Sequence, residues 1–115
     1  MNRFLMCVMA SMLSSALAVP LFAQDAAKID RGKMLFTAQK CSLCHSIDGK
    51  GNKKGLLDGI GSKLSSDDIR KWIVSAKEMA AKAKATRQPP MKDYSTLAPA
   101  DVDALVAYMS SLKTP

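Results

Sequence analysis

The chain has 115 residues, a formal net charge of +7, 48% apolar residues and only 5% aromatic residues. This length allows one domain and leaves no room for a separate substrate domain. The apolar fraction is that of a globular protein, the few aromatics argue against a nucleic-acid platform of stacked rings, and three cysteines are too few for a disulfide-rich miniprotein. We therefore expect a small basic domain that a cofactor or metal stabilises.

Residues 1–23 have the layout of a secretory signal peptide. Arg3 gives a positive start, a run that is apolar apart from three serines follows, and Ala23 ends it just before polar sequence. We predict cleavage after Ala23, export to the periplasm and a mature domain of residues 24–115. An uncleaved membrane anchor is the alternative, because the run is just long enough to span a bilayer. No second hydrophobic run follows, so we expect no stable membrane insertion after cleavage.

The next segment has helical spacing, with Ile29, Gly32, Leu35 and Phe36 on one face. We expect this helix to run up to Cys41. Glycine costs helix stability, so Gly32 predicts that a second helix crosses closely at this point.

Cys41-Ser42-Leu43-Cys44-His45 has the C-x-x-C-H pattern of c-type haem attachment. Two thiols three positions apart on a helical turn can reach both vinyl groups of one haem, and the adjacent His45 is then presented to the iron. We predict one haem c, bound through thioethers at Cys41 and Cys44. A thioredoxin-like dithiol would need a βαβ frame, a structural zinc site a fourth ligand, and a disulfide across so short a loop stabilises little.

A second axial ligand must be a residue other than histidine, since His45 is the single histidine of the chain. Among the methionines, Met34 lies on the preceding helix and Met109 at a core position of the last one. Met91 follows two prolines, which disfavour helix, and an extended approach holds its thioether away from a helix. We predict Met91 as the iron ligand and Met79 as the next candidate.

The remaining sequence predicts loop and further helices. Residues 46–63 contain five of the six glycines and are predicted as loop. Ser65 with Asp68 starts a helix that includes Trp72, and residues 77–84 continue it or begin another. Pro99 starts the clearest amphipathic helix. Its apolar stripe consists of Val102, Leu105, Val106, Met109 and Leu112.

Several of these segments carry a family resemblance. They are Gly32-Lys33-Met34-Leu35-Phe36 in the first helix, Leu57-Asp58-Gly59-Ile60-Gly61 in the loop, Pro90-Met91, and Leu105-Val106-Ala107-Tyr108 in the last helix. Together with C-x-x-C-H they resemble the short bacterial class I cytochromes c over about residues 28–113. The resemblance implies an all-α cytochrome c fold, with three to five helices around one haem and crossing N- and C-terminal helices.

The resemblance also implies roles for two further residues. Trp72 falls where many family members have a tryptophan near a haem propionate, although core packing would equally explain it. Where the family has Gly-Pro, with a proline carbonyl that accepts a hydrogen bond from the ligand histidine, this chain has Lys54-Gly55. The Gly55 carbonyl can accept that bond. The proline that often follows the distal methionine is Lys92 here.

The resemblance implies an electron carrier rather than an enzyme, with a dehydrogenase or quinol-oxidising complex as donor and an oxidase or reductase as acceptor. Full coordination by His45 and Met91 leaves no substrate position, and methionine ligation raises the reduction potential. A dedicated cytochrome subunit of a periplasmic dehydrogenase is one alternative. A haem protein with an open iron site for gas sensing or catalysis is another.

Basic side chains on both sides of the site predict an acidic redox partner, and predicted export together with few aromatics argues against nucleic acid. Such a ring of charge steers docking and weakens with salt, while a generally solvated basic surface is the alternative. The basic residues concerned are Lys40, Lys50, Lys53, Lys54, Lys82, Lys84, Arg87 and Lys92.

Overall fold

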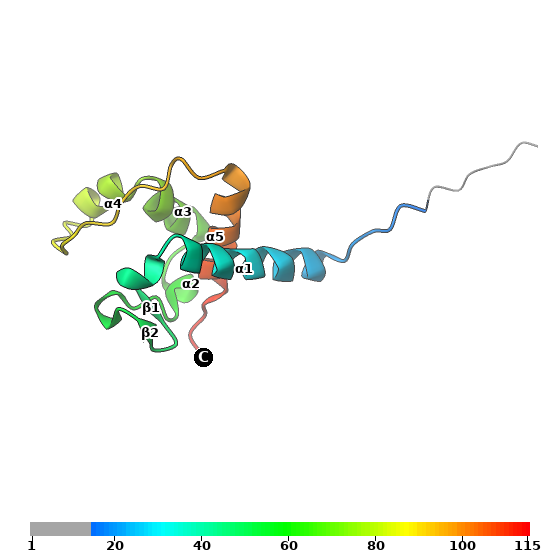
Figure 1. Ribbon diagram of the computed structural model, residues 1–115, viewed down its shortest axis with the longest axis horizontal. Coiled ribbons are helices and arrows are strands. Elements are labelled where there is room, and N and C mark those ends of the chain that lie inside the picture. The colour runs from blue at the N-terminus through cyan, green and yellow to red at the C-terminus, as the bar shows by residue number, and fades with distance from the viewer. Residues whose placement is uncertain (1–14) are drawn as a thin grey trace, which may run out of the picture.

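The computed structural model describes residues 15–115, so most of the predicted signal peptide lies outside the described part. Ala23, after which cleavage is predicted, lies in the first turn of the first helix. The described elements are α1 (Leu21–Ala38), β1 (Ser46–Ile47), β2 (Lys50–Gly51), α2 (Ile60–Lys63), α3 (Ser66–Val74), α4 (Ala76–Lys82) and α5 (Pro99–Ser111). This mainly helical arrangement, with α1 and α5 crossing, confirms the predicted all-α fold (Figure 1).

The crossing of α1 and α5 is centred on Gly32, as the sequence predicts. Gly32 is buried, and a Cβ atom there would collide with the carbonyl oxygen of Ala104 and lie 2.5 Å from the Cβ of Tyr108. Beside it, the rings of Phe36 and Tyr108 meet edge to face, with centroids 6.1 Å apart and planes at 86°. The missing side chain lets the two backbones approach, which offsets the cost of glycine in a helix.

The first helix ends earlier than predicted. α1 stops at Ala38, and Cys41 begins a separate 3₁₀ turn, Cys41–Leu43. Lys40 between them has a left-handed backbone, with φ 56° and ψ 36°, which a right-handed helix cannot contain. The prediction that the helix runs to Cys41 is therefore wrong, because apolar spacing earlier in the helix carries no signal for a left-handed residue at its end.

Residues 46–63, predicted as loop, contain regular elements. β1 and β2 pair antiparallel, and the turn between them, Asp48-Gly49, has positive φ at both positions. Asp-Gly is a signal for such a two-residue hairpin turn, but strands of two residues are too short to show alternation. The loop prediction missed this ribbon, the short 3₁₀ turn Lys53–Gly55 and α2.

The C-terminal residues are joined to α2 by hydrogen bonds. Gly61 N–H donates to the Leu112 carbonyl (2.8 Å), the Lys113 ammonium donates to the Gly61 carbonyl (2.7 Å), and Thr114 N–H donates to Ser62 Oγ (3.0 Å). α2 is only one turn long, and a helix this short is unstable by itself. These contacts with the end of α5 therefore stabilise its position.

Two separate helices follow α2. Ser65 Oγ accepts the Asp68 N–H (3.1 Å), which confirms the predicted helix start. Ser75, with φ −136° and ψ 43°, interrupts the helix, so α4 is distinct from α3. The chain after α4 then returns without regular structure, and Tyr94 N–H donates to the Ile73 carbonyl (2.8 Å).

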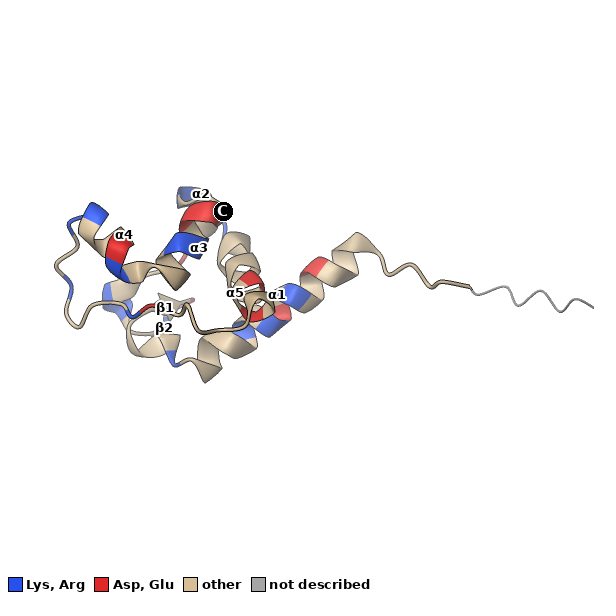
Figure 2. Ribbon diagram, turned by 90° about the horizontal axis from the view of Figure 1, so that it is seen from above, with Lys and Arg blue, Asp and Glu red and all other residues tan. Residues whose placement is uncertain are grey.

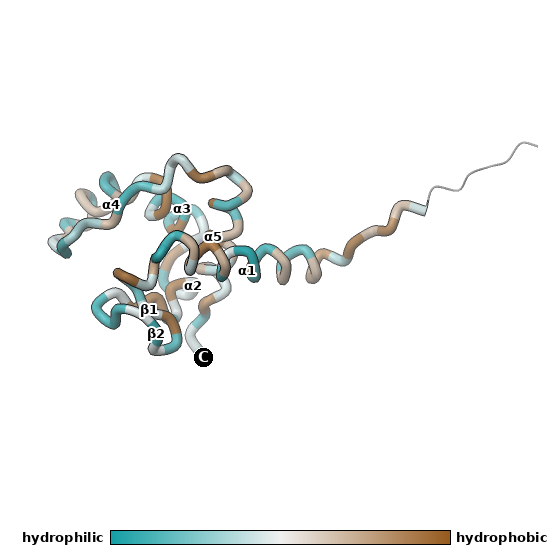
Figure 3. The backbone as a smooth tube through the Cα atoms, viewed as in Figure 1, coloured by the Kyte–Doolittle hydropathy of each residue, from teal (hydrophilic) through white to brown (hydrophobic). Residues whose placement is uncertain are grey.

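An apolar core lies between β1, α3 and α5. In Figure 3 the apolar part of α5 lies at the centre of the molecule, whereas β2 is hydrophilic. No helix within residues 15–115 is long and apolar enough to cross a membrane. The buried cluster consists of Ile47, Ile69, Ile73, Val102, Leu105, Val106 and Met109.

Candidate functional site

The turn that carries the two cysteines is fixed by backbone and side-chain hydrogen bonds. His45 N–H donates to the Cys41 carbonyl (2.9 Å). Asn52 N–H lies between the Ser42 and His45 carbonyls, at 3.1 and 3.0 Å, and the Asn52 amide donates to the Leu43 carbonyl (3.1 Å). Sequence reasoning missed Asn52, because a lone asparagine in a glycine-rich loop does not indicate which carbonyls it bonds.

The imidazole of His45 is oriented by Gly55. The distance from His45 Nδ1 to the Gly55 carbonyl oxygen is 3.1 Å. A carbonyl only accepts hydrogen bonds, so Nδ1 carries the hydrogen and Nε2 keeps its lone pair for a metal. Burial lowers the pKa of His45, the bond to Gly55 opposes this, and the nearby charge of Arg87 lowers the pKa further. A neutral ring of this kind is the form that binds iron.

Gly55 has no space for a side chain. A Cβ atom at this position would collide with the Cys44 carbonyl oxygen and with the Arg87 guanidinium, and would lie 2.9 Å from His45 Nδ1. The close approach of the Cys44 backbone gives the physical reason for glycine at this position.

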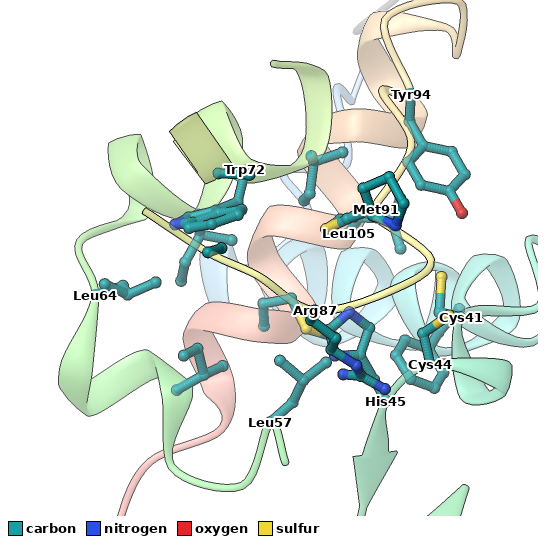
Figure 4. Close-up of a pocket in the computed structure, with 18 of the residues that line it drawn as sticks. Cys41, Cys44, His45, Leu57, Leu64, Trp72, Arg87, Met91, Tyr94 and Leu105 are labelled. Atoms are coloured by element: carbon teal, nitrogen blue, oxygen red, sulfur yellow. The ribbon is translucent and has the colours of Figure 1, made fainter. Parts of the chain in front are cut away.

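A cavity of about 560 Å³ lies beside the cysteine turn (Figure 4). This volume is within the range of small-molecule and cofactor sites, roughly 300–1,000 Å³. Cys41, Cys44, His45, Trp72 and Met91 all line it, so the structure brings five of the six predicted site residues to one cavity. The sixth, Gly55, does not line the cavity, but its carbonyl oxygen is bonded to the His45 ring, which does.

The other methionines are placed differently from Met91. Met34 is 71% exposed on α1, and neither Met34 nor Met79 lines the cavity. Met109 does line it, but it is 7% exposed and belongs to the apolar core on α5. Met91 is therefore the lining methionine that comes from a segment outside the helices.

The chemistry of the lining fits haem c. Most of it is apolar, as a porphyrin ring requires. Within residues 15–115 no carboxylate lines the cavity, and its charged side chains are Lys63 and Arg87, which suit the two propionates of a haem. Arg87 and Lys63 were not predicted as site residues, and only their position in the fold reveals them.

The two thiols and Tyr94 lie together at one side of the cavity. Cys41 and Cys44 form no disulfide within the described residues, and burial raises the pKa of the Cys41 thiol. Figure 4 shows the Tyr94 hydroxyl pointing toward Cys41. Burial raises the pKa of Tyr94. Sequence reasoning missed Tyr94, which lies three residues after Met91.

A comparison with protein families identifies the molecule. The model of the family described as Cytochrome c matches residues 29–113. The chain belongs to the cytochrome c family. Comparisons with curated proteins and with solved structures gave no match. As a member of this family, the cytochrome is a haem-based electron-transfer protein with covalently bound haem c, and the family consists in general of electron carriers.

Proposed function

We propose that this cytochrome carries one electron at a time through a single haem, with His45 and Met91 as the axial ligands. One observation supports this most strongly. His45 and Met91 line the same apolar cavity as both cysteines. Gly55 orients the His45 ring so that its Nε2 lone pair is available, and Met91 comes from the segment after α4. The bound haem iron supplies the chemistry, a change between the ferric and ferrous states.

The residues of the chain set the conditions for that electron transfer. Cys41 and Cys44 hold the porphyrin, and Gly55 keeps the His45 ring in one tautomer and orientation. The apolar lining excludes water, while the Trp72 N–H and the Arg87 guanidinium suit carboxylate groups at the cavity wall. With His45 and Met91 both bound to the iron, no position would remain for a substrate, so we expect electron transfer without catalysis.

We further propose that the cytochrome works in the periplasm with acidic redox proteins. Lysines around the cysteine turn, Lys40, Lys53 and Lys54, are exposed, and Figure 2 shows further basic residues along α4 and the loop after it. Leu43 and Leu56, 69% and 65% exposed, lie among these lysines in the sequence. Apolar side chains within basic surroundings suit a transient interface with a negatively charged partner.

Optical spectra of the protein produced with its haem-attachment machinery test the ligand assignment. We expect sharp low-spin c-type bands and the weak far-red band of methionine sulfur on ferric iron. Met91→Ala should abolish the far-red band, whereas Met34→Ala, a matched change at an exposed residue, should leave it intact.

The other outcomes of this experiment favour other functions. Haem bands without a far-red band, together with rapid carbon monoxide binding to the reduced protein, would indicate an open iron site for gas sensing or catalysis. Protein with free thiols and no haem would contradict the electron-carrier proposal and favour a dithiol function.

A further inference from the structure

The segment that carries Met91 lines the cavity, and Lys92 lies over the Tyr94 ring, but hydrogen bonds do not hold it along its length. Within the described chain, residues 86–92 make no hydrogen bond; the preceding anchor is the bond from Ala85 N–H to the Ala80 carbonyl (2.9 Å). A surface groove of about 490 Å³ separates this segment from α4. The backbone around Met91 is therefore positioned by its ends.

The C-terminal anchor of this segment is Asp93. Its carboxylate accepts the Lys77 N–H in the first turn of α4, at 2.9 Å. The residue before α4, Ser75, makes no side-chain bond to the helix, so Asp93 caps α4 from 16 positions along the chain. The next residue, Tyr94, adds its N–H bond to the Ile73 carbonyl. Two consecutive residues thus attach the segment at the junction of α3 and α4.

The distance along the chain makes this anchor relevant to the iron ligand. One residue, Lys92, separates Met91 from Asp93, so their Cα atoms lie at most about 7 Å apart. Movement of the backbone at Asp93 therefore also moves the backbone at Met91. A ligand whose binding position is only partly populated binds more weakly in proportion to that fraction.

We propose that Asp93 is a positioning residue for Met91: by capping α4 it holds the methionine segment where the thioether meets the iron. This inference rests on the proposed function, in which Met91 binds iron. Asp93 acts through the backbone and does not touch the cofactor. Loss of the Asp93 carboxylate should weaken the binding of Met91 to the iron, and should therefore favour any external ligand that competes with Met91.

This competition is measured by titrating the ferric holoprotein with imidazole and monitoring the loss of the far-red band. The loss of one capping bond is comparable to a tenfold change in an equilibrium. We therefore expect Asp93→Ala to bind imidazole about tenfold more tightly than the wild type. Asp93→Asn keeps an oxygen that can accept the Lys77 N–H, so its affinity should lie closer to that of the wild type.

Glu78→Ala is the matched control. Glu78 lies on α4 itself, its replacement by alanine removes one negative charge just as Asp93→Ala does, and its carboxylate is 2.8 Å from the Lys82 ammonium. It stabilises the helix without a bond to the methionine segment. Its imidazole affinity should equal that of the wild type. Equal affinities for Asp93→Ala and Glu78→Ala would overturn the inference.

A measurement on the unaltered protein avoids any dependence on a variant that folds poorly. Coupling between two sites is reciprocal, so displacement of Met91 by imidazole should speed hydrogen exchange at the Lys77 amide. Unchanged exchange there would overturn the inference. Absence of the far-red band from the wild type would overturn the proposed function as well, whereas a normal band with unchanged exchange would overturn the role of Asp93 alone.

Discussion

At the scale of single residues, Gly55 shows how backbone geometry orients the His45 ring, which we propose as an iron ligand. Its carbonyl oxygen selects the tautomer of His45, and its missing side chain leaves the Cys44 carbonyl and the Arg87 guanidinium in place. Both contributions depend on backbone position. A larger residue would shift the loop, and with it the acceptor for the imidazole.

Gly55→Ala should therefore destabilise the holoprotein and alter the haem spectrum. The added Cβ meets backbone, which cannot move aside, so we expect a loss of about 1–3 kcal/mol in the free energy of unfolding, as for overpacking. Denaturant titration of the oxidised protein measures it.

Gly49→Ala provides the comparison for Gly55. Gly49 has φ +76°, but no atom lies within 4 Å of a Cβ built there. The change should therefore cost only the backbone strain of about 1–2 kcal/mol and leave the spectrum unaltered. A spectral change in Gly49→Ala, or its absence in Gly55→Ala, would show that the acceptor carbonyl does not control the His45 ring.

At the scale of elements, the contact between α1 and α5 depends on one position. Gly32 brings the helices together, and the Arg31 guanidinium donates to the Asp101 carboxylate (Nε to Oδ1, 2.8 Å) at the same crossing. That ion pair is on the surface, and such pairs stabilise by at most about 1 kcal/mol. The close approach of the backbones is therefore the larger contribution.

Gly32→Ala tests this ranking. Helix propensity alone favours alanine by about 1 kcal/mol, but the collision with Ala104 and Tyr108 should reverse the sign and destabilise by about 1–3 kcal/mol. Thermal unfolding of the holoprotein measures the change. Lys33→Ala on the exposed side of α1 should stay within about 0.5 kcal/mol of the wild type. A stabilised Gly32→Ala variant would refute the close-contact explanation.

Some features of these elements could be predicted from the sequence, and others could not. The helix starts at Ser65 and Pro99 and the crossing at Gly32 were predictable, because each has a local signal in capping, backbone restriction or spacing. The cysteine–histidine motif likewise predicted where the cavity lies. The bonds of Asn52 and Asp93 join residues that no local pattern relates. The end of α1 depends on the left-handed backbone of Lys40, and lysine is not a residue type that signals it.

At the scale of the whole molecule, the chain encloses a large apolar cavity with a small core. Without haem, its lining would be exposed to water, and a domain of this size has little stability in reserve. The cofactor therefore takes the place of core side chains.

A variant without its attachment residues, Cys41→Ala with Cys44→Ala, should consequently be largely unfolded. Far-ultraviolet circular dichroism should show less than half the helical signal of the holoprotein and no cooperative thermal transition. A helical spectrum with a sharp transition would mean that the polypeptide folds without haem.

The charge of the molecule predicts a dependence on salt. The full chain has a net charge of +7, and the predicted cleavage, which removes Arg3, leaves +6. With exposed lysines around the site, electron transfer with an acidic redox protein should therefore slow as ionic strength rises. The Debye length falls from about 30 Å at 0.01 M to about 10 Å at 0.1 M. Stopped-flow rates measure this effect, with an uncharged small-molecule reductant as the control. Equal salt dependence for both reductants would exclude charge steering.

The bonds between the C-terminal residues and α2 also determine the order in which the molecule can be completed. In the proposed export, the chain crosses the membrane with its N-terminus first, so Cys41 and Cys44 would reach the far side before Lys113 could bond to Gly61. α2 borders the cavity through Ile60 and Lys63, and its wall cannot close until the last few residues are present. During that interval no folded pocket can retain a cofactor. Covalent attachment at Cys41 and Cys44 would therefore hold the haem before the C-terminal residues complete the pocket around it.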